Sequence, residues 1–126
     1  MYQLSISRDF IAQHYLIGGD WGRENQRHSH HYRVEILLSA EQLDRHGYLI
    51  DIVALEQALA EVIEQFRDRV LNELAAFSGL NPSLEHFARI FYESLYAKLQ
   101  LNAKLRVKIW ENADDWAAYC TPDDLF

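Results

Sequence analysis

The stretch His28-Ser29-His30-His31-Tyr32-Arg33-Val34-Glu35-Ile36-Leu37-Leu38 decides the fold, because polar and apolar side chains alternate along it. In an extended chain, side chains two positions apart project from the same face. The apolar positions of this stretch therefore line one face of a β-strand that we predict over residues 28–39. His28 and His30 project together from one face, whereas His31 projects from the other.

A second alternating stretch precedes the first one. Residues 2–14 place five apolar residues on one face, and Arg8 interrupts the run, which suggests a bulge near Arg8. The glycines at positions 18, 19 and 22 mark the loop that follows. We expect the strands over 2–14 and 28–39 to pair antiparallel through this loop. The apolar face of the first strand comprises Tyr2, Leu4, Ile6, Phe10 and Ala12.

The remaining chain predicts two helices and two further strands. Beyond a turn at 44–47, the period changes to that of a helix, first from Asp51 and then beyond a break at 78–82. Asp51 is placed to cap the first helix, and Asn81 or Ser83 to cap the second. A third strand over 105–109 and a short fourth strand through Trp116, Ala118 and Cys120 follow, separated by a turn at 112–115. The buried helical stripes comprise Leu55, Leu59, Val62 and Phe66, then Leu84, Phe87, Phe91 and Leu95.

This order of elements defines the expected fold class. Residues 1–126 are expected to form a single α+β domain, β-β-α-α-β-β, with a four-stranded antiparallel sheet and two helices on one face. A sheet of this size leaves exposed edges, so a larger oligomer is expected.

Composition excludes several classes of partner. The formal net charge of −7 argues against a nucleic-acid surface, and the apolar runs are too short to span a membrane. Cys120 is the only cysteine, so no intrachain disulfide can form. With the lack of a signal-like start, this usage predicts a cytoplasmic protein.

Three histidines form a candidate metal site. Antiparallel pairing of the first two strands would bring His14, at the end of one, beside His28 and His30, at the start of the other. Three neutral imidazoles suit Zn²⁺ and leave a fourth position for water or substrate. A His-x-His pair is a weak signal by itself, and His14 alone is also typical of a satisfied histidine at a strand end.

Glu111 is a candidate binding residue. It continues the parity of Leu105, Val107 and Ile109, so it ends an otherwise buried face. A carboxylate there needs a partner. One alternative is a salt bridge to Arg33 or another basic residue; the other is a ligand anchor that accepts two parallel N–H bonds, as from a pterin or guanine edge.

Five short motifs, read together, resemble the 6-pyruvoyltetrahydropterin synthase and 6-carboxytetrahydropterin synthase family over nearly the whole chain. Ser29 stands where the family's zinc motif usually has glycine. The motifs are Phe10-Ile11-Ala12-Gln13-His14, His28-Ser29-His30-His31-Tyr32, Gly47-Tyr48-Leu49-Ile50-Asp51-Ile52, Asn81-Pro82-Ser83-Leu84-Glu85 and Trp110-Glu111-Asn112.

The resemblance implies a tunnelling fold (T-fold), in which subunits form a trimeric barrel and two barrels stack as a hexamer. It also implies a zinc-dependent enzyme that acts on the side chain of a pterin such as 7,8-dihydroneopterin triphosphate. Zinc would act as a Lewis acid on the side-chain oxygens. Because the family's sites lie between subunits, Glu111 could serve a pocket completed by another chain's histidines.

The chain departs from the family at the residues that move protons. Glu24 stands where the family has a cysteine, and Arg67-Asp68 stands where it has an Asp-His pair before Leu71-Asn72. A family subgroup with glutamate at the cysteine position cleaves the side chain to leave 6-hydroxymethyl-dihydropterin. Glu24 is therefore a candidate base, the alternative being a solvated loop residue. Asp68 is a candidate replacement for the relay histidine, with Arg67 beside it as a phosphate contact, although both could equally lie on the exposed face of a helix end.

Three functions remain open. The first is a zinc-dependent lyase that makes a 6-carboxy or 6-pyruvoyl tetrahydropterin. The second is a Glu24-based side-chain lyase for folate synthesis. The third is a non-catalytic oligomer that binds a pterin or purine.

Overall fold

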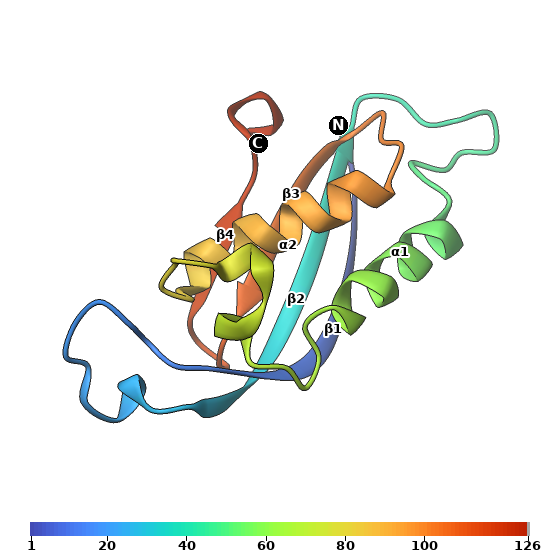
Figure 1. The fold of residues 1–126 in the computed structure, drawn as a ribbon. Coiled ribbons are helices and arrows are strands. Elements are labelled where there is room, and N and C mark those ends of the chain that lie inside the picture. Colours follow the sequence, from blue (N-terminus) through green and yellow to red (C-terminus); the bar gives the residue numbers. More distant parts are fainter. Residues whose placement is uncertain (126) are drawn as a thin grey trace.

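The computed structural model describes residues 1–125, and in that range four strands form one antiparallel sheet in the order β1-β2-β3-β4. Both helices lie on the same face of the sheet (Figure 1). The predicted α+β fold and its element order are therefore confirmed. The elements are β1 (Tyr2–His14), β2 (His28–Ala40), α1 (Ile52–Glu64), α2 (Leu84–Lys98), β3 (Lys104–Trp110) and β4 (Trp116–Tyr119).

The pairing of β1 with β2 is unbroken along both strands. It runs from Tyr2 opposite Ala40 to His14 opposite His28, so the bulge predicted near Arg8 is wrong. Arg8 pairs with Val34 in register, on the face that the helices cover. Its guanidinium remains half-exposed and forms an ion pair of 3.5 Å with Glu56 of α1. A charged residue on this face thus finds a partner without any change in the strand.

The core lies between the sheet and the two helices. Alternate residues of the central strands are buried against the apolar stripes of α1 and α2, as their periodicity predicted. The Asp51 carboxylate caps α1 by accepting from the Val53 and Ala54 amides, and the Ser83 hydroxyl caps α2. Stacked and edge-on aromatic rings fill the centre of this core: Phe10, Tyr32, Phe66, Phe77, Phe87 and Phe91.

The short strand β4 turns Tyr119 toward the helices. Tyr119 lies opposite the buried Val107 and packs edge-on against Tyr92 of α2. Trp116 lies on the uncovered face, where the Lys108 ammonium sits 4.0 Å from its ring centroid. The strand ends at Tyr119, one residue before the predicted end at Cys120.

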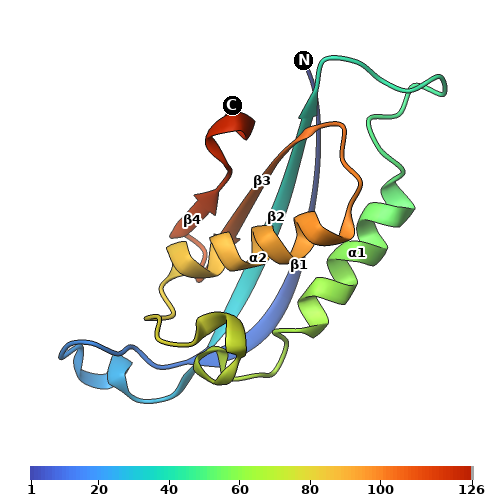
Figure 2. The ribbon, with the colours of Figure 1, turned by 45° about the horizontal axis from the view of Figure 1, so that its top comes forward.

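The end of β1 and the start of β2 meet the segment that joins the two helices. This segment forms two 3-10 turns, Leu71–Glu73 and Ala75–Phe77, and Val70 bridges to Gln13 of β1. The loop 15–27 extends from the same end of the sheet, away from both termini (Figure 2). In residues 1–125 no helix combines the length and the apolar character that crossing a bilayer requires.

Candidate metal and substrate site

The structure brings the three predicted histidines together. His14 lies directly opposite His28 in the ladder, and His30 follows two positions along β2 on the same face. The ring centroids of His14, His28 and His30 are 4.6, 4.7 and 4.8 Å apart. Strand pairing alone produces this convergence, because the side chains of directly opposed residues share a face.

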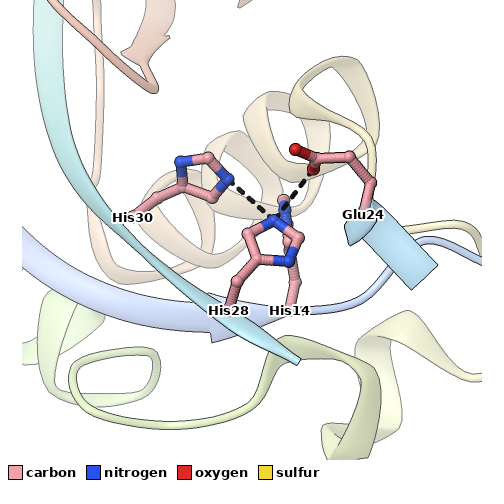
Figure 3. A group of neighbouring side chains, drawn as sticks. All are labelled: His14, Glu24, His28 and His30. Carbon is pink, nitrogen blue, oxygen red and sulfur yellow. Dashed lines mark hydrogen bonds and ion pairs between the residues drawn. The ribbon is translucent and has the colours of Figure 1, made fainter. Parts of the chain in front are cut away.

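Glu24 completes a group of four potential ligands. It belongs to the 3-10 turn Gly22–Asn25 in the loop between β1 and β2, and its Oε2 lies 3.0 Å from Nε2 of His28. One donor atom from each of His14, Glu24, His28 and His30 lies within 4.8 Å of every other. The four side chains point toward one common centre (Figure 3).

The contacts of His28 set its ring for metal binding. Its Nδ1 is 2.7 Å from the Gln26 carbonyl, to which it donates, so Nε2 is the ring nitrogen that faces the group. That Nε2 lies 3.0 Å from Nε2 of His30 and 3.0 Å from the Glu24 carboxylate. Lone pairs and a carboxylate that converge in this way require a proton or a cation between them. The donor set therefore fits a divalent metal.

His14 is the most enclosed of the three histidines. Its side chain is only 4% exposed, and its Nδ1 lies 3.1 Å from the Tyr32 hydroxyl. Burial, reinforced by the neighbouring His30 and His28, lowers the pKa of His14 from 6.5 to about 4. A hydrogen bond to the Pro82 backbone acts in the opposite direction and raises the pKa. His14 is therefore neutral near pH 7, which is the form that binds a metal.

Metal-free protein is expected to lose stability as the pH falls from about 6.5 to about 4. In this window the unfolded chain binds a proton at His14 that the folded chain excludes, so the free energy of unfolding rises with pH. The free energy of unfolding keeps its full value above pH 6.5 and is lower by up to about 3 kcal/mol near pH 4. Urea unfolding across this range measures the effect. A His14→Asn variant with an equally steep pH dependence would contradict it.

A pocket of about 560 Å³ opens beside the histidines and includes Glu111. Its wall contains His14, His30 and Glu24 of the same chain, so Glu111 and these histidines share one pocket within a single subunit. Burial, then the nearby Glu111 and then Glu24, raises the pKa of Tyr32. Arg33, one alternative partner for Glu111, projects from the opposite face and pairs with Asp9.

The structure places Asp68 outside this group. Asp68 adopts a left-handed conformation with φ of 58°, and its amide donates to the Ile11 carbonyl at the edge of β1. It lines a different pocket, of about 400 Å³, together with Arg27 and Arg69. Within one chain, Asp68 therefore does not meet the histidines.

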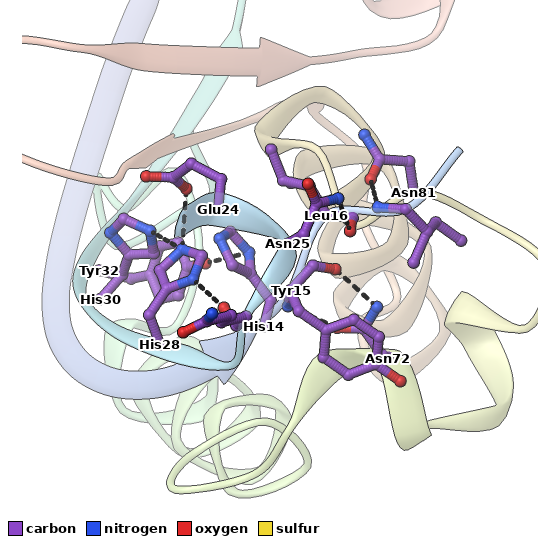
Figure 4. A network of polar contacts seen from close by, with 12 residues as sticks. His14, Tyr15, Leu16, Glu24, Asn25, His28, His30, Tyr32, Asn72 and Asn81 are labelled. Carbon is purple, nitrogen blue, oxygen red and sulfur yellow. Dashed lines mark hydrogen bonds and ion pairs between the residues drawn. The ribbon is translucent and has the colours of Figure 1, made fainter. Parts of the chain in front are cut away.

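Sequence reasoning missed the polar residues that surround the group. Tyr32 contacts His14, Gln26 orients His28, and three asparagines hold the loop that carries Glu24. The contacts of Tyr32, Asn72 and Asn81 join positions 18, 57 and 64 residues apart, so no local pattern marks them. The three asparagines are Asn25, Asn72 and Asn81 (Figure 4).

Fold and site together define a class: a small α+β protein with a histidine-rich candidate metal site at the end of a β-hairpin. Residues 3–122 match the family model described as 6-pyruvoyl tetrahydropterin synthase, and the chain belongs to this family. The predicted family resemblance is thus confirmed. No curated protein sequence matches the chain.

Solved structures show the same fold at low sequence identity. The Caenorhabditis elegans 6-pyruvoyl tetrahydropterin synthase is 20% identical, with a TM-score of 0.87 and 95% of each chain covered. The Plasmodium vivax synthase is 16% identical, with a TM-score of 0.75 and 94% of this chain and 96% of that one covered. A variant of the latter, in which a glutamate described as a catalytic residue is replaced by alanine, matches with 16% identity, the same coverage and a TM-score of 0.73. The predicted tunnelling fold is confirmed, and family and fold support a pterin synthase or lyase role.

Proposed function

We propose that this chain is a zinc-dependent lyase that cleaves the side chain of 7,8-dihydroneopterin triphosphate, with Glu24 as the base. The observation that carries the proposal is the position of the Glu24 carboxylate, 3.0 Å from His28 and within the group formed with His14 and His30. A carboxylate that converges with three imidazoles needs a proton or a cation between them, and a zinc ion held by the imidazoles would supply that cation.

His14, His28 and His30 would hold the zinc ion. Three imidazoles are a common ligand set for catalytic zinc, and they leave a coordination position for a substrate oxygen. Zinc, when bound, would supply Lewis acidity to the hydroxyl oxygens of the pterin side chain. Tyr32 and Gln26 would orient His14 and His28 through the contacts described above.

Glu24 would move the proton. As base it takes the proton from the hydroxyl on the second side-chain carbon, and the bond between the first and second carbons then breaks. The second carbon becomes an aldehyde that leaves with the triphosphate. The electron pair passes into the pterin ring, and a proton returned to the first carbon gives the 6-hydroxymethyl product. The catalytic glutamate of the Plasmodium vivax synthase supports this role for Glu24.

Glu111 would anchor the pterin ring in the same pocket. Its carboxylate can accept two parallel hydrogen bonds, from the 2-amino group and from N3–H. The ring would then lie with its side chain toward the histidines, because Glu111 and His30 line one pocket.

Glu111→Gln is expected to weaken pterin binding about 10- to 100-fold, because a donor NH₂ would face a ligand donor. Isothermal titration with 7,8-dihydroneopterin measures the change. Glu41→Gln, which removes the same charge just beyond the far end of β2, is the control and should bind as the wild type does. Equal affinity of Glu111→Gln and wild type would remove the anchor assignment.

A family-typical synthase that makes a 6-carboxy or 6-pyruvoyl product is the second candidate. The position of Asp68 argues against it within one chain, since that residue lies outside the pocket of Glu24. A product analysis distinguishes these candidate functions: the zinc-loaded protein is incubated with 7,8-dihydroneopterin triphosphate, and the products are identified. A 6-hydroxymethyl product supports the proposal, a 6-carboxy or 6-pyruvoyl product supports the second candidate, and unchanged substrate supports a non-catalytic binder.

We also propose that the chain acts as a homo-oligomer, either a trimer or a hexamer. β1 and β4 are the edge strands of the sheet, and Ile11 and Trp116 are 47% and 48% exposed on the face that the helices leave uncovered. Both features favour continuation of the sheet into neighbouring subunits. In such an assembly Asp68 could contribute to the pocket of a neighbouring subunit.

A further inference from the structure

The loop that carries Glu24 is tied to the rest of the molecule through the three residues that follow His14. Asn72 forms two hydrogen bonds with the backbone of Tyr15: the Tyr15 amide donates to Oδ1 at 3.0 Å, and Nδ2 donates to the Tyr15 carbonyl at 2.8 Å. The Ile17 amide donates to Oδ1 of Asn81 at 2.9 Å. Side chains from the segment between α1 and α2 therefore fix both neighbours of Leu16.

Leu16, held between these two points, binds the turn that contains Glu24. Its amide donates to the Glu24 carbonyl at 2.8 Å, and its carbonyl accepts from Nδ2 of Asn25 at 3.0 Å. Oδ1 of Asn25 also accepts from the Trp21 amide at 2.8 Å, a contact that stabilises the tip of the loop. Figure 4 shows Asn72 against Tyr15 and Asn25 against Leu16, beside Glu24 and the histidines.

The strands hold the histidines more than the asparagines do, although His14 also has a hydrogen bond to the Pro82 backbone beside Asn81. His28 and His30 stand on β2 and His14 on β1, inside a continuous ladder of backbone hydrogen bonds. Glu24 stands on a short turn in an exposed loop, and its side chain is about half-exposed. A loop of this kind has few contacts of its own to hold a side chain in one place.

From these contacts we infer that Asn72 and Asn81 are positioning residues for Glu24: they fix the backbone of Tyr15 and Ile17 so that Leu16 holds the Glu24 turn against the three histidines. Only the expected effect of the two asparagines on turnover rests on the proposed function. The effect on the loop can be measured without catalysis. Asn72 does not line the pocket of Glu24 and His30, whereas Asn81 lines it and uses its Oδ1 to accept from the Ile17 amide.

Alanine substitutions test whether the two asparagines anchor the loop. Asn72→Ala and Asn81→Ala should each speed amide exchange across residues 15–26 roughly tenfold, because the loop loses its anchors. Each should lower kcat about 10- to 100-fold, since a displacement of about 1 Å at a catalytic group can have an effect of that size. Zinc affinity should stay within about threefold of wild type, because the strands hold the histidines.

Aspartate variants distinguish an asparagine that only accepts a hydrogen bond from one that also donates. Asn81 is used as an acceptor from Ile17, so Asn81→Asp should keep the wild-type rate of amide exchange over residues 15–26. Asn72 is also used as a donor, so Asn72→Asp should be as damaging as Asn72→Ala, with a carboxylate facing the Tyr15 carbonyl. Asn102→Ala, at the other end of the sheet beside β3, is the control and should change neither exchange nor kcat.

Amide exchange by mass spectrometry, zinc titration and steady-state kinetics test the inference together. In a Glu24→Gln background, Asn81→Ala should have no further effect on kcat, since it acts through Glu24. Unchanged exchange over residues 21–26 in both alanine variants would overturn the inference, as would unchanged kcat in an active enzyme despite faster exchange. If the wild type turns over no pterin, the proposed function fails, and the exchange data still decide whether the asparagines fix Glu24.

Discussion

Glu24→Gln is expected to lower kcat for cleavage of 7,8-dihydroneopterin triphosphate by about 100- to 10 000-fold, the range typical of a removed general base. Glutamine keeps the shape of the side chain and its place 3.0 Å from His28, but it cannot accept the proton from the substrate hydroxyl. Zinc content should stay at the wild-type level, because three imidazoles remain. Steady-state kinetics and metal analysis of the same preparations measure both quantities.

Asp20→Asn is the matched control for this loop. It removes the same charge, and the amide oxygen of asparagine can still accept from Gly22 as the carboxylate does. Its kcat should equal that of the wild type. A Glu24→Gln enzyme that turns over at the wild-type rate would exclude Glu24 as the base. A variant that loses its zinc would instead identify Glu24 chiefly as a fourth ligand.

Removing two of the imidazoles is expected to abolish metal binding. In purified His28→Ala/His30→Ala protein, zinc should fall from stoichiometric to background, and lyase activity should fall with it, because His14 and Glu24 alone cannot form a closed ligand set. The protein should still fold, since both histidines are only partly buried and the core lies elsewhere. Metal analysis and circular dichroism measure the two outcomes.

His31→Ala/His46→Ala removes the same number of histidines and serves as the control. His31 projects from the uncovered face of the sheet, and His46 lies in the turn before α1. This variant should keep its zinc. An equal loss of zinc from both double variants would show that binding is not specific to the group at the end of β1.

The elements were predictable because periodicity reports burial. On β2, which has one covered face, the alternating residues are Val34, Ile36 and Leu38. On α1, the residues at helical spacing are Leu55, Leu59 and Val62. All six are fully buried in the structure. Arg8 was misread as the mark of a bulge, because its partner Glu56 lies 48 positions away and is invisible to any local pattern. The same limit applies to Arg33, whose partner is Asp9 across the strand pair rather than Glu111.

The site was predictable where strand geometry fixes it. The parity of His28 and His30, together with hairpin pairing, is enough to bring His14 beside them. The loop residue Glu24 required the family resemblance, because the sequence of a loop does not determine its direction. The asparagines that hold it were not predictable, since Asn72 and Asn81 bind backbone atoms 57 and 64 positions away and leave no periodic signal.

The central claim is that three imidazoles from two adjacent strands hold one zinc ion. Zinc X-ray absorption on the purified wild-type protein tests it most directly, because it reports the number, the kind and the distance of the ligands. The account predicts stoichiometric zinc with imidazole nitrogens at about 2.0–2.1 Å from His14, His28 and His30, with this signal lost in His28→Ala/His30→Ala. A purified wild-type protein that binds no zinc even when it is supplied, or binds it without imidazole ligands, would contradict the account.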